Sequence, residues 1–582
     1  KMNSKPGLQL RWVSGALLAV LVFWWLRMPL LVEPGVERGW NSDHAIYGLM
    51  AQRIRDTGRL PFFFWGQDFL GPMTPALTAG VSRARLSPRC EPLDLRLAAF
   101  LQHCLGLLAW GAGLRLLFGS PVAVGAMVLL AIGPAFFLEA NLQPETLLFC
   151  GGLLFWFGSR LVGSIEEARP RQLLYLGLAT GFLWWMHPGV VFVAVPVLVL
   201  LALRSGWYPP IRTGLAPAGR CRFSAAALGW SPPAPLALAA HVVQAYCGLR
   251  FLSFLTTPFT GIGVPGLVWH ESLAEPLLLL GLVHVGMAIP GIRTDSAWRT
   301  LRPALAWMLP FAAGFAVGHA PPLVGRLLDT YEPAYSFDAA LTPDAFTLSR
   351  IGTFLGRDLL PFTSGSSSVA AHVFAWGLVL GFALAGIRRR SRVAALLLLR
   401  PGVAGGTALA AGVVLLTFYF FLIRPRSASQ VHYLVLAFPA LLGLAAEGLR
   451  HGLPTRRATW LLPALLAACG VLALQDGFRT ARAAILAEPD PHALIQTIRR
   501  AGYSVCYANY WVAYKSQFLS RETVRFIPYH SRDRKPDESR GLRSSPGPKC
   551  LVSESGTVRE FLPEDERNQG GPARRRRSPV TP

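Results

Sequence analysis

Charged residues are scarce in this 582-residue sequence. Asp, Glu, Lys and Arg together make up 15% of the chain, whereas 52% of it is hydrophobic and the mean hydropathy is +0.40. An ordinary soluble domain carries about 25% charged residues. The composition therefore excludes a soluble globular protein and indicates that most of the chain lies in lipid.

Cysteine is also rare, and its spacing excludes a zinc or redox motif. The eight cysteines include no C-x-x-C pair, and most of them lie in or beside apolar runs. Cys506 and Cys550 instead lie in the hydrophilic C-terminal part. We expect these two to form a disulfide if that part is outside the cytoplasm.

Acidic residues are outnumbered by basic ones, 32 to 56, which gives a net charge of +24. In a soluble protein this excess would suggest nucleic acid as a partner. Here the arginines cluster between apolar runs, where basic residues fix the orientation of membrane spans. We therefore expect membrane lipids, and no nucleic acid, as partners.

Apolar runs follow one another along most of the chain. Residues 12–32 form the first, which is long enough to cross a ~30 Å hydrocarbon layer and is preceded by basic residues. We expect an uncleaved anchor with a cytoplasmic N-terminus. A later run, 173–203, is too long for one span, and His187-Pro188 marks a turn within it. Counting such runs predicts an all-α polytopic membrane protein with about 13 transmembrane helices.

An odd number of crossings divides the chain into regions. Residues 1–475 form a multi-span transmembrane domain, in which residues 33–93 are a large first outer loop. Arg-rich gaps between later spans are predicted to be cytoplasmic. Everything after residue 475 then lies on the outer face.

The C-terminal part has the pattern of a small α/β domain over residues 476–563. An amphipathic helix is expected at 491–502, and strands are expected at 504–508 and 524–528. Residues 564–582 are rich in Arg, Gly and Pro, so we expect a disordered basic tail.

The first outer loop contains a pattern typical of an amphipathic helix. Ile46, Leu49, Met50 and Ile54 recur at helical spacing, which suggests a helix lying on the membrane surface. Asp43 lies at the start of this helix and has two interpretations. It is an N-cap, or it is a carboxylate that the positive end of the helix dipole keeps available to accept a proton.

An aromatic segment follows in the same loop. Residues 60–65 are typical of an anchor at the membrane interface. Such an anchor would hold Gln67 and Asp68 near the lipid headgroups, beside Asp43.

Two stretches of this loop carry a family resemblance. N-S-D-H-A-I-Y-G-L-M-A-Q-R-I at residues 41–54 and L-P-F-F-F-W-G-Q-D-F-L-G at 60–71 resemble the first outer loop of bacterial GT-C glycosyltransferases. The resemblance is to family 39 and the protein mannosyltransferases, and to the related lipid A aminoarabinose transferase. His44 stands where the family has Glu, and Trp65 and Phe69 stand where it has Tyr. Residues 181–188, 430–434 and 507–522 resemble later motifs of these enzymes.

The resemblance implies a GT-C-like fold in the bacterial cytoplasmic (inner) membrane. It also implies an inverting hexosyl or pentosyl transferase that takes a sugar from a polyprenyl-phosphate donor and passes it to a lipid or glycan acceptor of the cell envelope. The C-terminal domain would be extracytoplasmic.

Asp43 is the candidate catalytic base under this resemblance. Arg424 and Arg426 follow a predicted span at its outer end, and Arg meets phosphate with paired hydrogen bonds. No cofactor is expected, and a divalent metal is unsupported because no carboxylate pair accompanies Asp43. The candidate substrate-binding residues are His44, Gln67, Asp68, Glu139, Glu145, Arg424, Arg426 and His432.

Two alternatives remain open at this point. The first is a non-catalytic relative that keeps the architecture, which the His44 substitution favours. The second is a transporter or lipid flippase, which would be expected to carry charged residues inside its spans. Most spans here carry charge only at their ends.

Overall fold

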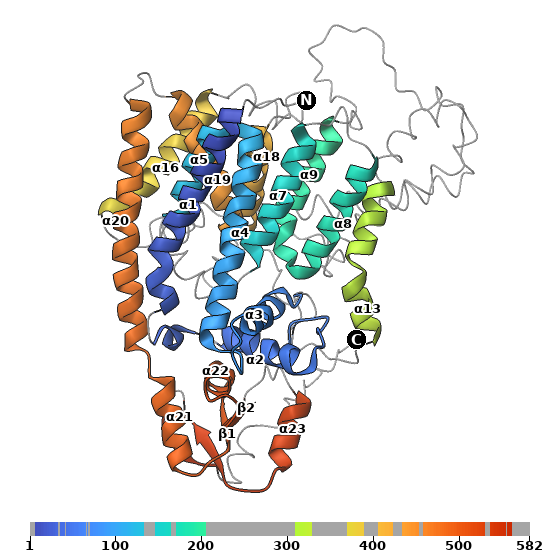
Figure 1. Cartoon of the computed structure of the whole chain (residues 1–582), viewed down its shortest axis with the longest axis vertical. Helices are drawn as coiled ribbons and strands as arrows, with labels where there is room; N and C mark the ends of the chain where they lie inside the picture. The colour runs from blue at the N-terminus through green and yellow to red at the C-terminus, as the bar shows by residue number, and fades with distance from the viewer. Residues whose placement is uncertain are drawn as a thin grey trace, which may run out of the picture.

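The computed structural model describes the chain in segments. They are residues 6–32, 35–40, 42–65, 67, 70–132, 146–163, 170–204, 309–328, 369–388, 406–422, 434–452, 458–529, 536–553 and 556–561. These residues form a mostly helical molecule with a small sheet near the C-terminus (Figure 1). The structure thus confirms the mostly helical fold with a small C-terminal α/β module that the sequence predicts.

Long helices stand side by side and form a bundle (Figure 1). Their sequences are apolar, and a helix satisfies its own backbone hydrogen bonds where water is excluded. The described members are α1 (Pro6–Val32), α4 (Pro92–Phe118), α5 (Ser120–Ala131), α7 (Leu147–Gly163), α8 (Pro170–Met186), α9 (Val191–Arg204), the helix Leu309–Gly318 with α13 (Ala320–Leu328), α16 (Val369–Arg388), α18 (Gly406–Leu422), α19 (Leu434–Gly452) and α20 (Ala458–Ala487).

Trp110 lies at the centre of the bundle core. Its side chain is fully buried, its ring lies 4.4 Å from that of Phe155, and its indole N–H donates to the Leu148 carbonyl at 3.1 Å. A buried indole N–H needs such a partner, because an unpaired donor would cost about 1–3 kcal/mol. This contact joins α4 to α7 through both packing and a hydrogen bond.

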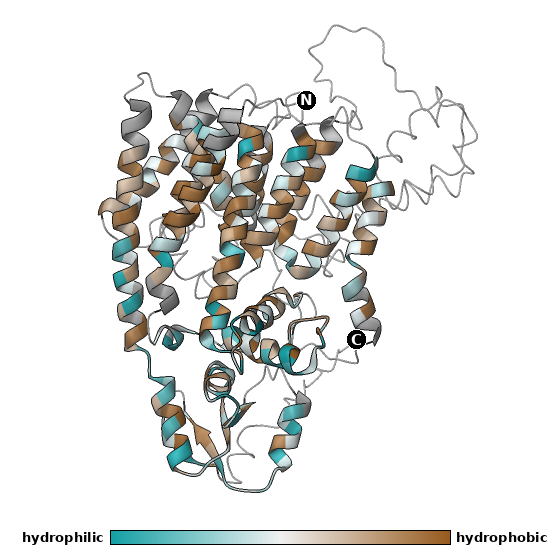
Figure 2. Cartoon of the chain, in the orientation of Figure 1, coloured by the Kyte–Doolittle hydropathy of each residue, from teal (hydrophilic) through white to brown (hydrophobic). Residues whose placement is uncertain are grey.

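The outer faces of the bundle are apolar as well. Trp25 is 74% exposed, Val317 65% and Trp376 59%. Figure 2 shows hydrophobic residues around the long helices and hydrophilic ones at the end that carries the sheet. Hydrocarbon accommodates such outward side chains, whereas water does not.

Length and hydropathy single out one helix as a candidate membrane span. Within the described residues, α4 is the helix that is both long and apolar enough to cross a membrane, and the other apolar helical stretches span 10–17 residues. The prediction of about 13 crossings therefore stays a prediction.

Two helices approach each other through glycines. A Cβ atom added at Gly177 or Gly181 of α8, or at Gly314 or Gly318 of the facing helix, would lie 2.0–2.3 Å from a carbonyl oxygen of the other helix. Any side chain at these four positions would clash with a backbone. This is the small-x-x-x-small packing typical of helices in membranes.

The predicted turn at His187-Pro188 is confirmed. The helix α8 ends at Met186, the 3₁₀ helix η3 covers Pro188–Val190, and His187 Nδ1 accepts a hydrogen bond from the Gly189 N–H at 3.1 Å. Trp185 Nε1 donates to the Phe62 carbonyl at 2.9 Å. The turn is therefore attached to the first outer loop, at the same end of the bundle.

The first outer loop folds into η1 (Val36–Gly39), α2 (Ser42–Thr57) and α3 (Met73–Ala84). The predicted amphipathic helix is present as α2, and Ile46, Leu49 and Met50 are at most 3% exposed. The expectation that this apolar face lies on the membrane is wrong. Aromatic side chains of the C-terminal part pack against this face and cover it, so protein and not lipid removes it from water.

The aromatic segment of the loop is also covered by protein. Phe64 is 1% exposed, its ring lies 4.7 Å from that of Tyr47 on α2, and the Trp65 N–H points to Met50 Sδ at 3.4 Å. The sequence suggested that Phe64 is an anchor in the lipid interface. In the structure it packs inside the loop instead.

The C-terminal module, residues 491–561, combines helices with a sheet of order β2-β1-β3-β4. The strand β1 is parallel to β2 and β3, and β4 is antiparallel to β3. The helix and the two strands expected from the sequence are α21, β1 and β2. The elements are α21 (Pro491–Arg500), β1 (Val505–Asn509), α22 (Tyr510–Leu519), β2 (Arg525–Tyr529), α23 (Pro536–Ser544), β3 (Lys549–Val552) and β4 (Val558–Glu560).

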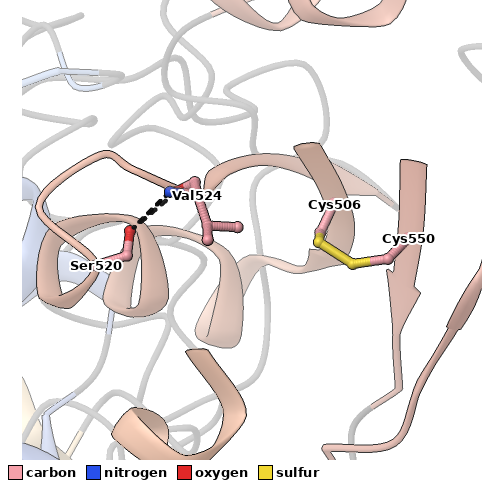
Figure 3. Close-up of a disulfide and its surroundings, with 4 residues drawn as sticks. All are labelled: Cys506, Ser520, Val524 and Cys550. Atoms are coloured by element: carbon pink, nitrogen blue, oxygen red, sulfur yellow. Dashed lines mark hydrogen bonds between the residues drawn. A yellow bond between two sulfur atoms is a disulfide. The ribbon is translucent and has the colours of Figure 1, made fainter. Parts of the chain in front are cut away.

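The predicted disulfide is present in this module. Cys506 on β1 and Cys550 on β3 are directly opposite in the parallel register, with Cα atoms 4.4 Å apart (Figure 3). Nearby, the Val524 N–H donates to Ser520 Oγ at 3.4 Å and closes the turn that leads into β2 (Figure 3). The sheet is thus fixed covalently across its centre.

Candidate active site

Asp43 lies where the first outer loop meets the C-terminal module. The helix α2 begins at Ser42, so Asp43 belongs to its first turn and is partly exposed. Its Oδ1 accepts a hydrogen bond from the hydroxyl of Tyr510, the first residue of α22 and 467 positions away in the chain. The carboxylate is thus held by a residue of the C-terminal module, in addition to its place in the first turn of α2.

A second hydrogen bond joins the same two helix starts. Ser42 Oγ donates to the carbonyl oxygen of Tyr510, and the Ser42 side chain is fully buried. Asn509 caps α22, because its side chain accepts from the Val512 N–H at 3.0 Å. The cap fixes where α22 begins and therefore where Tyr510 lies relative to Asp43.

Apolar contacts support these bonds. The side chain of Phe518 lies against Gly48 so closely that a Cβ atom added there would be 2.4 Å from the ring. Gly48 is thus a close-approach position between α2 and α22. The whole cluster comprises Trp40, Ala45, Ile46, Leu49, Met50, Phe64, Leu95, Tyr510, Tyr514 and Phe518.

His44 faces this cluster. It is 3% exposed, and its ring is stacked 6.2 Å from that of Trp40, which in turn stacks on Phe518 at 6.3 Å. The structure therefore places the residue that replaces the family's Glu inside the contact between loop and module. Its role in substrate binding stays a prediction.

The side-chain oxygen of Gln67 is an acceptor without a partner among the described residues. The backbone N–H of this residue donates to the Phe64 carbonyl at 3.0 Å, and its Oε1 is buried with no hydrogen-bond partner among the described residues. A buried oxygen of this kind costs free energy until it finds a donor. Gln67 is therefore suited to accept a hydrogen bond from a ligand hydroxyl.

Six of the predicted site residues cannot be placed. They lie outside the described residues, and they are Asp68, Glu139, Glu145, Arg424, Arg426 and His432. Among the residues that the structure does describe, no three His, Cys, Asp or Glu side chains come together as a possible metal site.

A charged cluster that the sequence did not indicate lies beside the candidate site. Glu37 of η1 is 3.3 Å from Arg96 of α4 and 3.4 Å from His492 of α21. Arg38 is 3.2 Å from Asp490. These ion pairs join η1, α4 and the module, and we call the whole contact between the first loop and the module the loop–module junction.

The pKa values within this cluster are shifted in opposite directions. Burial raises the pKa of Glu37, but the hydrogen bond to His492, a backbone hydrogen bond and the charge of Arg96 together outweigh burial and lower it. The hydrogen bond to Glu37 raises the pKa of His492 despite partial burial. Each partner thus favours the charged form of the other.

Sequence reasoning missed this cluster and Tyr510 for the same reason. Glu37 and His492 are 455 positions apart, and neither lies in a recognisable motif. Tyr510 lies within a stretch that resembles GT-C enzymes, yet nothing local shows which residue its hydroxyl meets.

No protein-family model and no curated protein matches the sequence. Among solved structures, the oligosaccharyltransferase AglB from Archaeoglobus fulgidus, in complex with an inhibitory peptide and a dolichol-phosphate, aligns with 14% identity and a TM-score of 0.45. The alignment covers 89% of this chain and 64% of AglB, so the chain spans a little under two thirds of that enzyme's length.

A second solved structure is ArnT from Cupriavidus metallidurans, bound to undecaprenyl phosphate. It aligns with 16% identity over 94% of this chain and 93% of its own, with a TM-score of 0.31. Both neighbours are glycosyltransferases of the GT-C superfamily, the group that the loop motifs resemble. Alignments with TM-scores below 0.5 carry no argument about substrates.

Proposed function

We propose that this chain is a membrane glycosyltransferase that moves a sugar from a polyprenyl-phosphate-linked donor to a cell-envelope acceptor at the outer face of the membrane. The observation that carries the proposal is the placement of Asp43. It lies in the loop whose motifs resemble GT-C enzymes, and its carboxylate is partly exposed and held by Tyr510.

The chemistry assigned to Asp43 is general base catalysis. An acceptor hydroxyl attacks C1 of the sugar, the bond from C1 to the phosphate oxygen breaks, and the hydroxyl proton passes to the carboxylate. The lipid phosphate leaves with the bonding electrons, and the configuration at C1 is inverted. The reaction needs a carboxylate that is reachable and well oriented, which is what the first turn of α2 provides.

The donor must be oriented as well. Gln67 Oε1 is suited to accept a hydrogen bond from a sugar hydroxyl, because it is buried and lacks a partner among the described residues. Arg424 and Arg426 are proposed to hold the departing phosphate, since paired hydrogen bonds from a guanidinium stabilise developing negative charge.

The test is a transfer assay with the purified full-length chain in lipid nanodiscs. A radiolabelled polyprenyl-phosphate hexose or pentose is supplied with envelope lipid acceptors, and labelled product is measured for the native chain and Asp43→Asn. We expect native transfer and a loss of at least about hundredfold in the variant, the usual contribution of a general base.

Asp56→Asn is the matched control. Asp56 lies on the same helix α2, is exposed, and accepts a hydrogen bond from Gln52 at 2.7 Å on the helix surface. The control should retain native activity. Absence of transfer by the native chain with every donor, or full activity of Asp43→Asn, would show that the proposed function is wrong.

A transporter or flippase remains the second candidate, and one observation favours it. Arg27 of α1 is 1% exposed, and its guanidinium lies 4.4 Å from the Phe23 ring inside the bundle. Buried cations within spans are typical of transport pathways. Movement of a fluorescent polyprenyl phosphate between leaflets, without sugar transfer, would support this candidate in place of the first.

A further inference from the structure

The two hydrogen bonds at the loop–module junction are arranged around one residue of the module. Tyr510 donates through its hydroxyl to Asp43 Oδ1 and accepts at its carbonyl from Ser42 Oγ. Ser42 is fully buried and Tyr510 is 6% exposed. The donor side of the bond to Asp43 is therefore buried, whereas the carboxylate itself is partly exposed.

The ring of Tyr510 and its hydroxyl have separable roles. The ring makes edge contacts with Trp511 at 5.0 Å and with Tyr514 at 5.7 Å, and it packs within the apolar cluster between α2 and α22. Packing of this kind needs only the aromatic ring, as phenylalanine would provide. The hydroxyl adds one specific interaction, and that interaction is with the proposed base.

A short carboxylate side chain at the start of a helix can rotate between orientations. A charge-assisted hydrogen bond from a fixed donor selects one of them. The donor here is held in place, because Asn509 caps the start of α22 and Phe518 packs closely against Gly48 of α2. Pre-orientation matters for catalysis, since small displacements of a reacting group lower the rate strongly.

We propose that Tyr510 is a positioning residue for Asp43, so that the C-terminal module completes the active site and does more than cap the bundle. This inference rests on the proposed function, because it assigns Tyr510 a role in the same transfer. Tyr510 does not exchange a proton with the substrate; it holds the carboxylate that does.

Tyr510→Phe tests the inference, because it removes the hydroxyl and keeps the ring. In the nanodisc transfer assay, kcat should fall about tenfold, while KM for the donor lipid stays within about twofold. The midpoint of thermal unfolding and the hydrogen exchange of α22 should stay at native values. A residue with only a structural role would alter stability, or KM, along with kcat.

Tyr529→Phe is the control with the same chemical change. Tyr529 lies in the same module, on β2 opposite Asn509, and its hydroxyl donates to the Val552 carbonyl of β3 at 3.4 Å. It should leave kcat unchanged.

Each remaining outcome counts against the inference. A kcat of Tyr510→Phe within twofold of native, or a fall in kcat accompanied by loosened α22, overturns the positioning role while the proposed function stands. If the native chain transfers no sugar, the proposed function fails and the role of Tyr510 falls with it.

Discussion

The glycine contact inside the bundle and the loop–module junction hold helices together in different ways. Between α8 and the helix Leu309–Gly318, backbone meets backbone through glycines, with no room for a side chain. At the junction, aromatic side chains lie between α2 and α22, and hydrogen bonds join the starts of these two helices. Ion pairs join η1 to α4 and to α21. A side chain added at the first contact would meet backbone, which cannot move aside, so we call that contact rigid; one added at Gly48 would meet the end of a side chain, so we call the second contact adjustable.

The difference fits the tasks of the two regions. In lipid, burial of apolar surface against a neighbour gains little over lipid itself, so close packing carries helix association. At the junction, water is available outside the cluster, so aromatic burial is favourable and polar groups can be aimed at specific partners. A site that must position a carboxylate is better built in the second way.

The largest effect is expected at the rigid contact. A Cβ atom at Gly177 would lie 2.0 Å from the Phe311 carbonyl oxygen, and a backbone cannot move aside as a side chain does. We expect Gly177→Ala to lower the free energy of unfolding by about 3 kcal/mol, measured by denaturant titration in mild detergent.

Gly125→Ala on α5 is its control, since an added Cβ meets nothing within 4 Å there. Alanine favours helix over glycine by about 1 kcal/mol, so this variant should be neutral or slightly stabilised. Equal destabilisation of both variants would show that the glycines of α8 are not a close contact.

Local sequence patterns predicted the bundle side of this comparison well. Apolar runs located α1 and α18, and the pair His187-Pro188 located the turn between α8 and α9. These features are encoded within a few residues by hydropathy and by the loss of a backbone donor at proline. The α21 helix and strands β1 and β2 were predicted for the same reason.

The junction was not predictable in this way. The amphipathic pattern of α2 identified a buried face but not what buries it, and lipid and protein aromatics satisfy the same pattern. Asp43 was selected from its motif, yet its partner Tyr510 is 467 positions away. Contacts at such separation depend on how the chain packs, which no local periodicity encodes.

A smaller effect is expected for the matching substitution at the junction. A Cβ at Gly48 would lie 2.4 Å from the Phe518 ring, which is the far end of a side chain and can shift. We expect Gly48→Ala to cost about 1 kcal/mol and to speed hydrogen exchange in α22, detected by mass spectrometry. A cost as large as that of Gly177→Ala would contradict the distinction between a rigid and an adjustable contact.

The smallest effect concerns pH and the ion pairs of the junction. The pKa of His492 is raised, chiefly by its hydrogen bond to Glu37, and the nearby charges are Asp490, which raises it further, and Arg38, which opposes it. A raised pKa means that the charged imidazolium stabilises the folded state. This contribution is complete below the unfolded pKa of about 6.5 and is lost as pH rises through the higher folded value.

The pKa of Glu37 is lowered, so its contribution has the opposite dependence: it is present above the ordinary carboxyl range and is lost as pH falls through the folded value. The junction should therefore be tightest in mildly acidic solution, between these two limits.

Because the His492 side chain is 49% exposed, solvent screens its ion pair with Glu37, and the change in the free energy of unfolding between pH 6 and pH 8.5 should stay below about 0.5 kcal/mol. Hydrogen exchange of α21 at the two pH values, corrected for intrinsic rates, should show this slight loosening in the native chain and none in His492→Gln. A loosening that persists in the variant would assign the pH dependence to another group.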